Sequence, residues 1–344
     1  MNISEYTAKY DLQNQFNVLV ETYSQIDSAW GNEIDIEKLK TKKFRNIIIS
    51  GLGGSAISGD LIGNFLKDDL KLPLFVNRNY TLPEFTDKNT LLIISSYSGN
   101  TEETISVLEE GIKKKCPMIC VTTGGKIGEI AGKKEIPIVK MKPGFQPRYA
   151  LGTSFFSLLK VFVQLGLIPP HDEIVLKIRN LWEQKGNEYS AENNIAYNCA
   201  EQLIGFIPVI YSAAELTSAA GYRFKCQLNE NSKLHSFHNI IPELNHNEII
   251  GWESFNSNQF NAKLINILDQ SYHPQVKKRF EITTELAVKK GLEYMNIESE
   301  EEDFKVRLMD LIYLFDWITY YTAVLRGFDP SEIDNIYTLK ERLS

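Results

Sequence analysis

The stretch Phe44-Arg-Asn-Ile-Ile-Ile-Ser-Gly-Leu-Gly-Gly-Ser-Ala-Ile-Ser-Gly-Asp60 passes from a β-branched run through glycine into a helical pattern. A second stretch of this kind is Thr90-Leu-Leu-Ile-Ile-Ser-Ser-Tyr-Ser-Gly-Asn-Thr-Glu-Glu103. A strand that turns through glycine into a helix leaves backbone N–H groups uncovered, and these donors and the helix dipole favour an anion. The hydroxyl groups expected around that place belong to Ser55, Ser96, Ser98 and Thr101. The two stretches therefore predict a phosphate pocket.

The first half of the chain alternates short apolar runs with amphipathic helical patterns, which indicates a doubly wound parallel sheet. The predicted strands are Phe44–Ser50, Leu74–Asn77, Thr90–Ile94, Met118–Thr122 and Ile136–Lys140. In the flavodoxin-like order 2-1-3-4-5, strands one and three are neighbours at the topological switch point. The loops that follow these two strands would then converge on one crevice.

Helix capping is the alternative explanation for the second group of hydroxyls. Thr101 can cap a helix predicted over Thr101–Lys115, and Ser and Thr are also favoured in turns. One hydroxyl is enough for a cap, whereas Ser96, Ser98 and Thr101 place three within six residues. We therefore favour phosphate binding.

The second half of the chain alternates in the same way, which predicts a second α/β domain. Its expected strands are Phe206–Ser212, Ser236–Ile241, Lys263–Leu268 and Glu293–Ile297. The apolar stretch Leu308–Leu325 contains two aspartates and is predicted to be a core helix rather than a membrane span. We expect an N-terminal helical arm over residues 1–35, a first domain over 36–168, a helical connector over 169–193, and a second domain with C-terminal helices over 194–344.

The bulk composition narrows the class of protein. The 344 residues are 43% hydrophobic and 24% charged, as in globular proteins, and are long enough for two domains. The net charge of −7 argues against a nucleic-acid or membrane-surface binder, so an anionic ligand would need local cations.

No metal site is predicted, because His235 and His238 would lie on opposite faces of a strand and the four cysteines have no paired metal spacing. The N-terminus lacks a basic-then-apolar signal, and we expect a cytoplasmic protein.

A nicotinamide enzyme is one alternative. Gly51, Gly53 and Ala56 satisfy the G-x-G-x-x-A fingerprint, which is weak on its own. The fingerprint expects an acidic residue about 20 positions later, where this chain has Asn77-Arg-Asn79. Because Arg78 could bind a 2′-phosphate, an NADP enzyme stays open as a minor alternative.

Arg148, in the segment Gln146–Thr153, is the cation best placed for an anion site, because it follows the fifth predicted strand. There it could form charge-assisted hydrogen bonds with an anion, although a lone arginine is as often a solvated surface charge.

Further candidates lie in the second half of the chain. Glu230 stands between two asparagines at the end of a helical stretch, and His246 lies in a polar loop with Glu243 and Glu248 as rival carboxylates. Surface positions are the ordinary explanation for such residues, and Lys340 is by default an exposed charge near the C-terminus.

These motifs together resemble the bifunctional phosphoglucose/phosphomannose isomerases, which are built from two sugar-isomerase (SIS) domains. The motifs are Gly53-Gly-Ser55, Ser96-Tyr-Ser-Gly-Asn-Thr101, Pro147-Arg-Tyr-Ala150, Asn229-Glu-Asn231 and Pro-Glu-x-x-His-Asn at 242–247. The resemblance covers nearly the whole chain in the family's motif order. It implies two SIS-type, flavodoxin-like domains and a metal-independent aldose–ketose isomerase without a cofactor. Its reaction would interconvert glucose 6-phosphate or mannose 6-phosphate with fructose 6-phosphate through a cis-enediolate.

The resemblance also implies roles for individual residues. The positions that match the phosphate-binding set are Gly54, Ser55, Ser96, Ser98 and Thr101. Arg148 matches the arginine that stabilises the enediolate, Glu230 the base, and His246 the ring-opening histidine. Lys340 matches the lysine near the C-terminus. In similar enzymes the histidine comes from the partner subunit, so the resemblance implies a homodimer.

A non-catalytic SIS-domain sensor of sugar phosphates is the alternative from another class. Such a protein keeps the phosphate pocket but lacks the chemistry. Regulators of this type usually carry a DNA-binding helical domain, and the net charge and short N-terminal segment give no sign of one.

Overall fold

The computed structural model describes residues 2–343 and contains two parallel β-sheets, here called sheet A and sheet B. The chain divides into two units around these sheets. The sheet-A unit comprises Glu21–Asn180, and the sheet-B unit comprises Met1–Val20 together with Leu181–Ser344. Each unit is described by itself below.

Sheet A has the strand order β2-β1-β3-β4-β5, with every pair parallel. Its strands are β1 (Asn46–Ser50), β2 (Leu74–Asn77), β3 (Thr90–Ser96), β4 (Met118–Thr122) and β5 (Ile138–Lys140). Strands β3 and β4 are buried along their whole length, which explains why their sequences are continuous apolar runs rather than alternating ones. The order confirms the predicted 2-1-3-4-5 arrangement, with β1 and β3 as neighbours.

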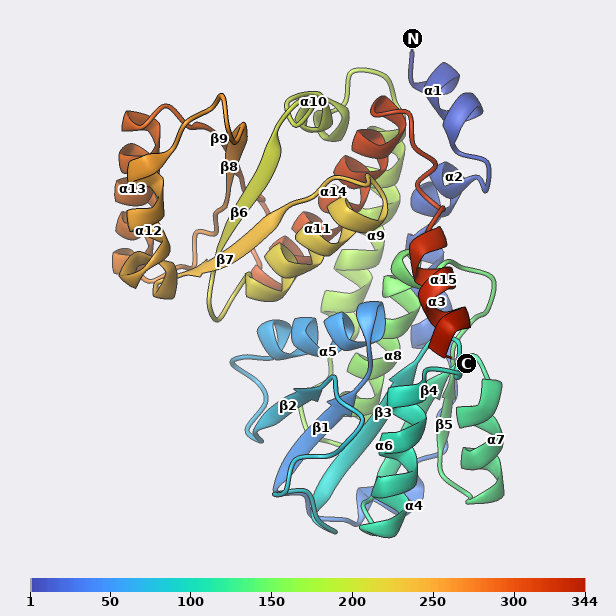
Figure 1. The fold of residues 1–344 in the computed structure, drawn as a ribbon. Coiled ribbons are helices and arrows are strands. Elements are labelled where there is room, and N and C mark those ends of the chain that lie inside the picture. The colour runs from blue at the N-terminus through green and yellow to red at the C-terminus, as the bar shows by residue number, and fades with distance from the viewer. Residues whose placement is uncertain (1, 344) are drawn as a thin grey trace. The chain divides into compact units, whose positions relative to one another are not determined.

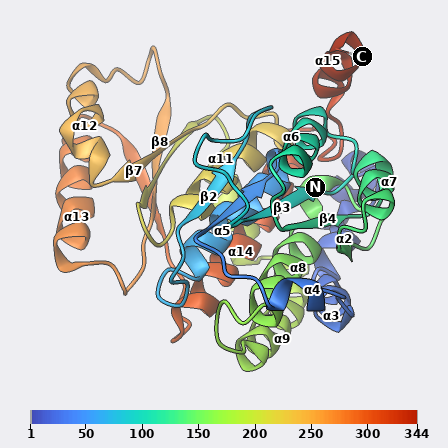
Figure 2. The ribbon, with the colours of Figure 1, turned by 90° about the horizontal axis from the view of Figure 1, so that it is seen from below.

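Helices cover both faces of sheet A. They are α3 (Tyr23–Gly31), α4 (Glu37–Lys40), α5 (Gly53–Phe65), α6 (Glu102–Lys113), α7 (Gly125–Lys133), the 3-10 turn η1 (Pro147–Tyr149) and α8 (Leu151–Gln164). Helices α6 and α7 lie on one side of β3 and β4, and α8 with α3 lies on the other (Figure 2). Helix α9 (Asp172–Ser190) contains the boundary between the two units.

Sheet B has the order β7-β6-β8-β9 and is also parallel. Its strands are β6 (Ile207–Ala213), β7 (Phe237–Ile241), β8 (Ala262–Ile267) and β9 (Glu293–Ile297). The helical elements of this unit are α1 (Ile3–Tyr10), α2 (Gln15–Val20), α10 (Ile195–Glu201), α11 (Ser218–Glu230), η2 (Glu243–His246), α12 (Glu248–Gly251), η3 (Trp252–Ser254), α13 (Pro274–Lys289), α14 (Phe304–Leu325) and α15 (Asp334–Leu343). Helix α13 lies on one face of the sheet, and α11 and α14 lie on the other (Figure 1). Two parallel α/β sheets confirm the predicted fold class.

Helix α14 is the core helix of the sheet-B unit. It is long and apolar enough to cross a membrane by length and composition, but 94% of its apolar 18-residue window is buried inside the protein. Its buried charges are paired: Asp316 with Arg223 of α11 at 2.8 Å, and Arg307 with Asp269 at 2.8 Å. Helices α1 and α2 also pack against α14, whereas α3 packs against α8 of the sheet-A unit. The segment before residue 35 is therefore shared between the two units.

Candidate active site

The two glycine- and hydroxyl-rich loops meet at the carboxyl edge of sheet A. Strands β1 and β3 are in register there, with Ser50 opposite Ile94. The loop after β1 is in direct contact with the end of β3, because a Cβ added to Gly51 would lie 2.8 Å from the carbonyl oxygen of Ser95. The N-termini of α5 and α6 begin at these loops, and their first N–H groups have no acceptor within the helix. The convergence predicted from the strand order is therefore confirmed.

The loop from Ser96 to Thr101 is organised by its own hydroxyls. The Oγ of Ser96 and the Oγ1 of Thr101 are 3.0 Å apart and hydrogen-bonded, and the Gly99 N–H donates to Ser96 Oγ at 3.2 Å. The Asn100 N–H donates to Ser98 Oγ at 3.3 Å. Thr101 does occupy the N-cap position of α6, but its hydroxyl makes no capping bond. The side-chain cap, which was the alternative explanation for this hydroxyl, is not formed, because Thr101 is hydrogen-bonded to Ser96 instead.

Close backbone packing fixes the shape of this loop. Gly99 has a φ of +69°, in the left-handed region, and a Cβ there would lie 1.9 Å from the Gly124 carbonyl oxygen. Only glycine fits this position without displacing the β4–α7 loop. The hydroxyls of the loop are thus presented on a rigid backbone.

Arg148 belongs to the same edge of the sheet-A unit. A Cβ on Gly54, in the first turn of α5, would lie 3.2 Å from the carbonyl oxygen of Pro147, so the two segments are in contact. Arg148 is the middle residue of η1, and only 5% of its surface is exposed. The sequence left open whether this arginine is a solvated surface charge. Its burial beside the α5 N-terminus excludes that alternative.

Arg78 is engaged elsewhere in the sheet-A unit. Its guanidinium forms an ion pair with Asp60 of α5. The cation that kept a 2′-phosphate site open is therefore already paired with a carboxylate. This contact argues against the NADP alternative.

Glu230 is the last residue of α11 and is half-buried. A row of polar side chains fastens this end of the helix to α14. Arg223, two turns before Glu230, and Gln227, one turn before it, donate to Oδ1 of Asp316 at 2.8 and 2.5 Å. Asn231, the next residue, donates to Thr319 Oγ1 at 3.0 Å. Buried hydrogen bonds of this kind fix the helix end in one position.

The structure distinguishes the carboxylates that were rivals in the His246 loop. Glu243 is exposed, and so is His246 at the end of η2. Glu248 instead accepts hydrogen bonds from Tyr211 Oη at 2.7 Å and from Asn239 Nδ2 at 2.5 Å. Its carboxylate is therefore occupied by partners in sheet B.

Glu230 and His246 lie at opposite edges of sheet B. Helix α11 ends near the start of β7, where the Ser236 hydroxyl donates to Asn229 Oδ1 at 3.1 Å. His246 follows the other end of β7. A five-residue strand at about 3.3 Å per residue spans roughly 16 Å. Within a single chain, Glu230 therefore lies near the amino ends of the strands of sheet B, and His246 lies beyond their carboxyl ends.

Lys340 lies on α15, a helix that buries none of its residues. The structure thus groups Gly54, Ser55, Ser96, Ser98, Thr101 and Arg148 at one edge of sheet A. Glu230, His246 and Lys340 lie on three separate elements of the sheet-B unit. Among residues 2–343, no group of three or more His, Cys, Asp or Glu side chains is arranged to hold a metal ion.

His238, one of the histidines rejected as a metal ligand, is a half-buried residue with a structural hydrogen bond. Its Nε2 is 2.8 Å from the Ser212 hydroxyl, and burial, assisted by the nearby Lys225 ammonium, lowers the pKa of His238 to about 4. The histidine of the unfolded chain has a pKa near 6.5. As the pH falls from 6.5 towards 4, the unfolded chain therefore binds a proton at this residue and the folded chain does not. Stability from this group is complete above pH 6.5 and is lost as the pH falls towards 4.

We expect the wild type to lose about 2 to 3 kcal/mol more stability than His238→Asn between pH 7.5 and 4.5. Urea unfolding of both proteins at the two pH values measures this difference. Equal losses would show that His238 does not carry the effect.

Comparisons with known proteins agree with this architecture. Residues 192–343 match the family model for the bacterial phospho-glucose isomerase C-terminal SIS domain. The chain is 38% identical over 327 residues to the bifunctional phosphoglucose/phosphomannose isomerase of Caldicellulosiruptor bescii, covering 93% of this chain and 96% of that protein. The chain belongs to the bifunctional phosphoglucose/phosphomannose isomerase family. The family resemblance inferred from the motifs is confirmed.

A second member of this family, from Aquifex aeolicus, is 35% identical over 341 residues, covering 96% of this chain and 99% of that protein. Among solved structures, the tagatose-6-phosphate ketose/aldose isomerase of Escherichia coli has a TM-score of 0.66 at 15% identity. It covers 92% of both chains. At that identity the likeness shows that the fold is shared.

Proposed function

We propose that this member of the family interconverts glucose 6-phosphate, mannose 6-phosphate, or both, with fructose 6-phosphate through a cis-enediolate, without a metal ion or redox cofactor. The observation that carries the proposal is the meeting of two hydroxyl-rich loops and a buried arginine at the switch point of sheet A. Both aldose phosphates give the same enediolate, because they differ only at C2.

The sugar phosphate is assigned to the edge of sheet A where α5 and α6 begin. Backbone N–H groups at the two helix N-termini and the hydroxyls of Ser55, Ser96 and Thr101 would bind the phosphate oxygens. The phosphate does not react, so its binding energy serves to position the sugar. Gly54 and Ser98 complete the assigned set.

The chemistry is assigned to the remaining candidates. His246 donates a proton to the ring oxygen and opens the ring, a task suited to an imidazole near neutral pH. Glu230 takes the proton from C2 of the open aldose and returns it to C1 to give the ketose. Arg148 donates hydrogen bonds to the enediolate oxygen while the negative charge develops there. Lys340 is assigned to the site on the family resemblance alone.

A homodimer is part of the proposal. Within one chain, Glu230 and His246 lie at opposite edges of sheet B, so one substrate cannot contact both from the same copy. An exposed His246 is suited to reach the substrate bound by a second copy. We therefore infer that the partner subunit supplies the ring-opening histidine.

A cytoplasmic location is also inferred. All four cysteines are free, and Cys116, Cys120 and Cys199 are buried. Burial raises the pKa of Cys120 to about 12, so this thiol stays protonated and unreactive. Free, inert thiols are typical of a reducing compartment.

The proposed function is tested by measuring turnover of both aldose phosphates in the presence of EDTA, with the Ser96→Ala variant alongside. The wild type should form fructose 6-phosphate from at least one of them. Ser96→Ala should raise KM about tenfold and change kcat less than threefold, because a hydrogen bond to a charged group contributes about 1.5 to 3 kcal/mol. Ser106→Ala is the control and should behave as wild type, because it removes a half-buried α6 hydroxyl that donates to the Tyr80 carbonyl oxygen rather than to the loop at 96–101. Binding of fructose 6-phosphate without turnover would instead identify a sugar-phosphate sensor.

A further inference from the structure

The loop that carries His246 exposes the histidine but anchors the residues on both sides of it. Among residues 2–343, no partner binds the His246 imidazole, which is exposed. Its neighbours Asn245 and Glu248 each make two hydrogen bonds to other elements of the sheet-B unit. A side chain that projects from a firmly held backbone is arranged for use rather than for packing.

The anchor after the histidine is a hydrogen-bond chain that leads into the sheet. Trp252 Nε1 donates to Tyr211 Oη at 2.8 Å, and Tyr211 donates to Glu248 at 2.7 Å. Asn239 of β7 donates to the second oxygen of Glu248 at 2.5 Å. Tyr211 is 0% exposed, and burial raises the pKa of its hydroxyl, so it remains a proton donor to the carboxylate. Glu248 is thus fixed to both β6 and β7.

The anchor before the histidine joins the loop to α13. Asn245 donates from Nδ2 to Thr283 Oγ1 at 2.8 Å, and its Oδ1 accepts from Arg279 at 3.3 Å. Thr283 is buried, so this contact is protected from competing water. Together the two anchors tie the short segment around His246 to the sheet on one side and to a helix on the other.

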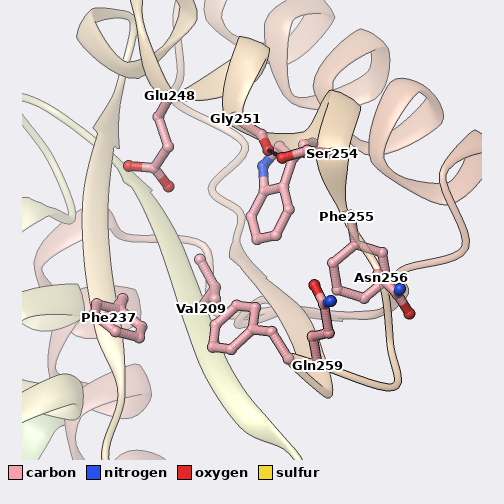
Figure 3. Close-up of a pocket in the computed structure, with 10 residues that line it drawn as sticks. Val209, Phe237, Glu248, Gly251, Ser254, Phe255, Asn256 and Gln259 are labelled. Atoms are coloured by element: carbon pink, nitrogen blue, oxygen red, sulfur yellow. Dashed lines mark hydrogen bonds between the residues drawn. The ribbon is translucent and has the colours of Figure 1, made fainter.

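The segment that follows is held by apolar packing as well as by hydrogen bonds, because Trp252 belongs to the core cluster of the sheet-B unit and Phe255 and Phe260 pack against that cluster. An open pocket of about 390 Å³ lies between the strands and residues 248–260. In Figure 3, Val209 and Phe237 line it from the strands, and Phe255 and Gln259 line it from the loop. Glu248 lies at the end of the pocket next to the histidine loop (Figure 3). At the histidine end of this segment, the hydrogen bonds of Glu248 attach the loop directly to β6 and β7.

We propose that Glu248 and Asn245, supported by Tyr211, are positioning residues that hold His246 at the angle needed for ring opening. The inference rests on the proposed isomerase function. It gives the hydrogen bonds of Glu248 and Asn245, which do not touch the substrate, the role of orienting His246. A displacement of about 1 Å can cost on the order of 100-fold in rate, so a histidine that serves a neighbouring subunit needs such an attachment.

The test is a double-variant cycle with Tyr211→Phe and His246→Ala, measured on fructose 6-phosphate. Tyr211→Phe removes one hydroxyl and leaves Glu248 without its buried donor. We expect kcat to fall about 10- to 30-fold with KM within twofold. In the His246→Ala background the same change should cost less than twofold, because a positioning residue has nothing left to position.

Tyr321→Phe is the matched control, since it removes a hydroxyl that is equally buried but lies on α14 and donates to Tyr189. It should leave kcat within twofold. The proposal would be overturned if the fold-losses in kcat of the two single variants multiplied in the double variant. It would also be overturned if kcat were unchanged in Tyr211→Phe. Should Tyr211→Phe not fold, Asn245→Ala takes its place in the same cycle with the same expectations. A wild type without isomerase activity would instead refute the proposed function.

Discussion

Replacing Glu230 by glutamine should lower kcat for both directions of the isomerisation by about 10³- to 10⁴-fold, near the upper end of what one general base contributes. The amide has almost the shape of the carboxylate but cannot accept the proton from C2. Binding of fructose 6-phosphate should change less than threefold, because the phosphate is assigned to the other unit. Exchange of the C1 proton with D2O, followed by NMR, and calorimetric binding measure the two effects separately.

Glu243→Gln is the control for this substitution. Glu243 is an exposed carboxylate in the same unit, within the 242–247 motif that carries His246, and its variant should retain wild-type exchange. Persistent proton exchange in Glu230→Gln would assign the base to another residue. Loss of exchange in both variants would show that the effect comes from the charge of the region and not from one carboxylate.

The position of Glu230 explains why even the conservative substitution Glu230→Asp should reduce activity. Glu230→Asp keeps the charge but withdraws the carboxylate by one methylene, and the helix end cannot follow it. Asn231 is bound to Thr319, and Gln227 to Asp316, so α11 is held at both sides of the glutamate. Burial raises the pKa of Asp316, and the ion pair with Arg223 offsets part of this rise. The buried ion pair thus holds α11 in one position relative to α14.

The fold could be predicted because its signals are local. Strands β3 and β4 are buried on both faces, and such strands have continuous apolar sequences that differ from the helical pattern between them. Once five such strands alternate with helices, right-handed crossovers leave few strand orders. The observed order then brings the Gly51 and Ser96 loops together without any further information. The meeting of the segments to which we assign the phosphate was predictable for the same reason.

Contacts between residues far apart in the sequence could not be predicted in this way. Spacing could not decide whether Arg148 is buried, since the answer depends on the backbone of Gly54 almost a hundred positions earlier. Nor could it show that the Thr101 hydroxyl binds Ser96 instead of capping its helix. Tyr211 looks like any apolar strand residue in the sequence, and its bond to Glu248 depends on how the following loop folds back. Such positioning contacts leave no local pattern.

The second large effect is expected at Arg148. Arg148→Lys should reduce kcat by about 10²- to 10³-fold, although the positive charge is kept. The removal of one preorganised donor to a developing oxyanion costs about 2.7 to 4 kcal/mol in comparable sites. A lysine offers a point charge on a flexible stem in place of the planar fork that can hold two oxygens, and the buried position leaves it little room to adapt.

Two ligands separate transition-state from ground-state binding by this residue. Sorbitol 6-phosphate carries the phosphate but no enediolate oxygens, whereas a five-carbon sugar-phosphate hydroxamate carries both. Calorimetry should show Arg148→Lys losing about 100-fold in affinity for the hydroxamate and less than threefold for sorbitol 6-phosphate. Equal losses for the two ligands would make Arg148 a phosphate ligand, as its proximity to the α5 N-terminus also permits. A loss confined to the hydroxamate would mean that the arginine acts on the charge that appears only as the proton leaves C2, since only a group that binds this charge more tightly than the substrate can accelerate the reaction.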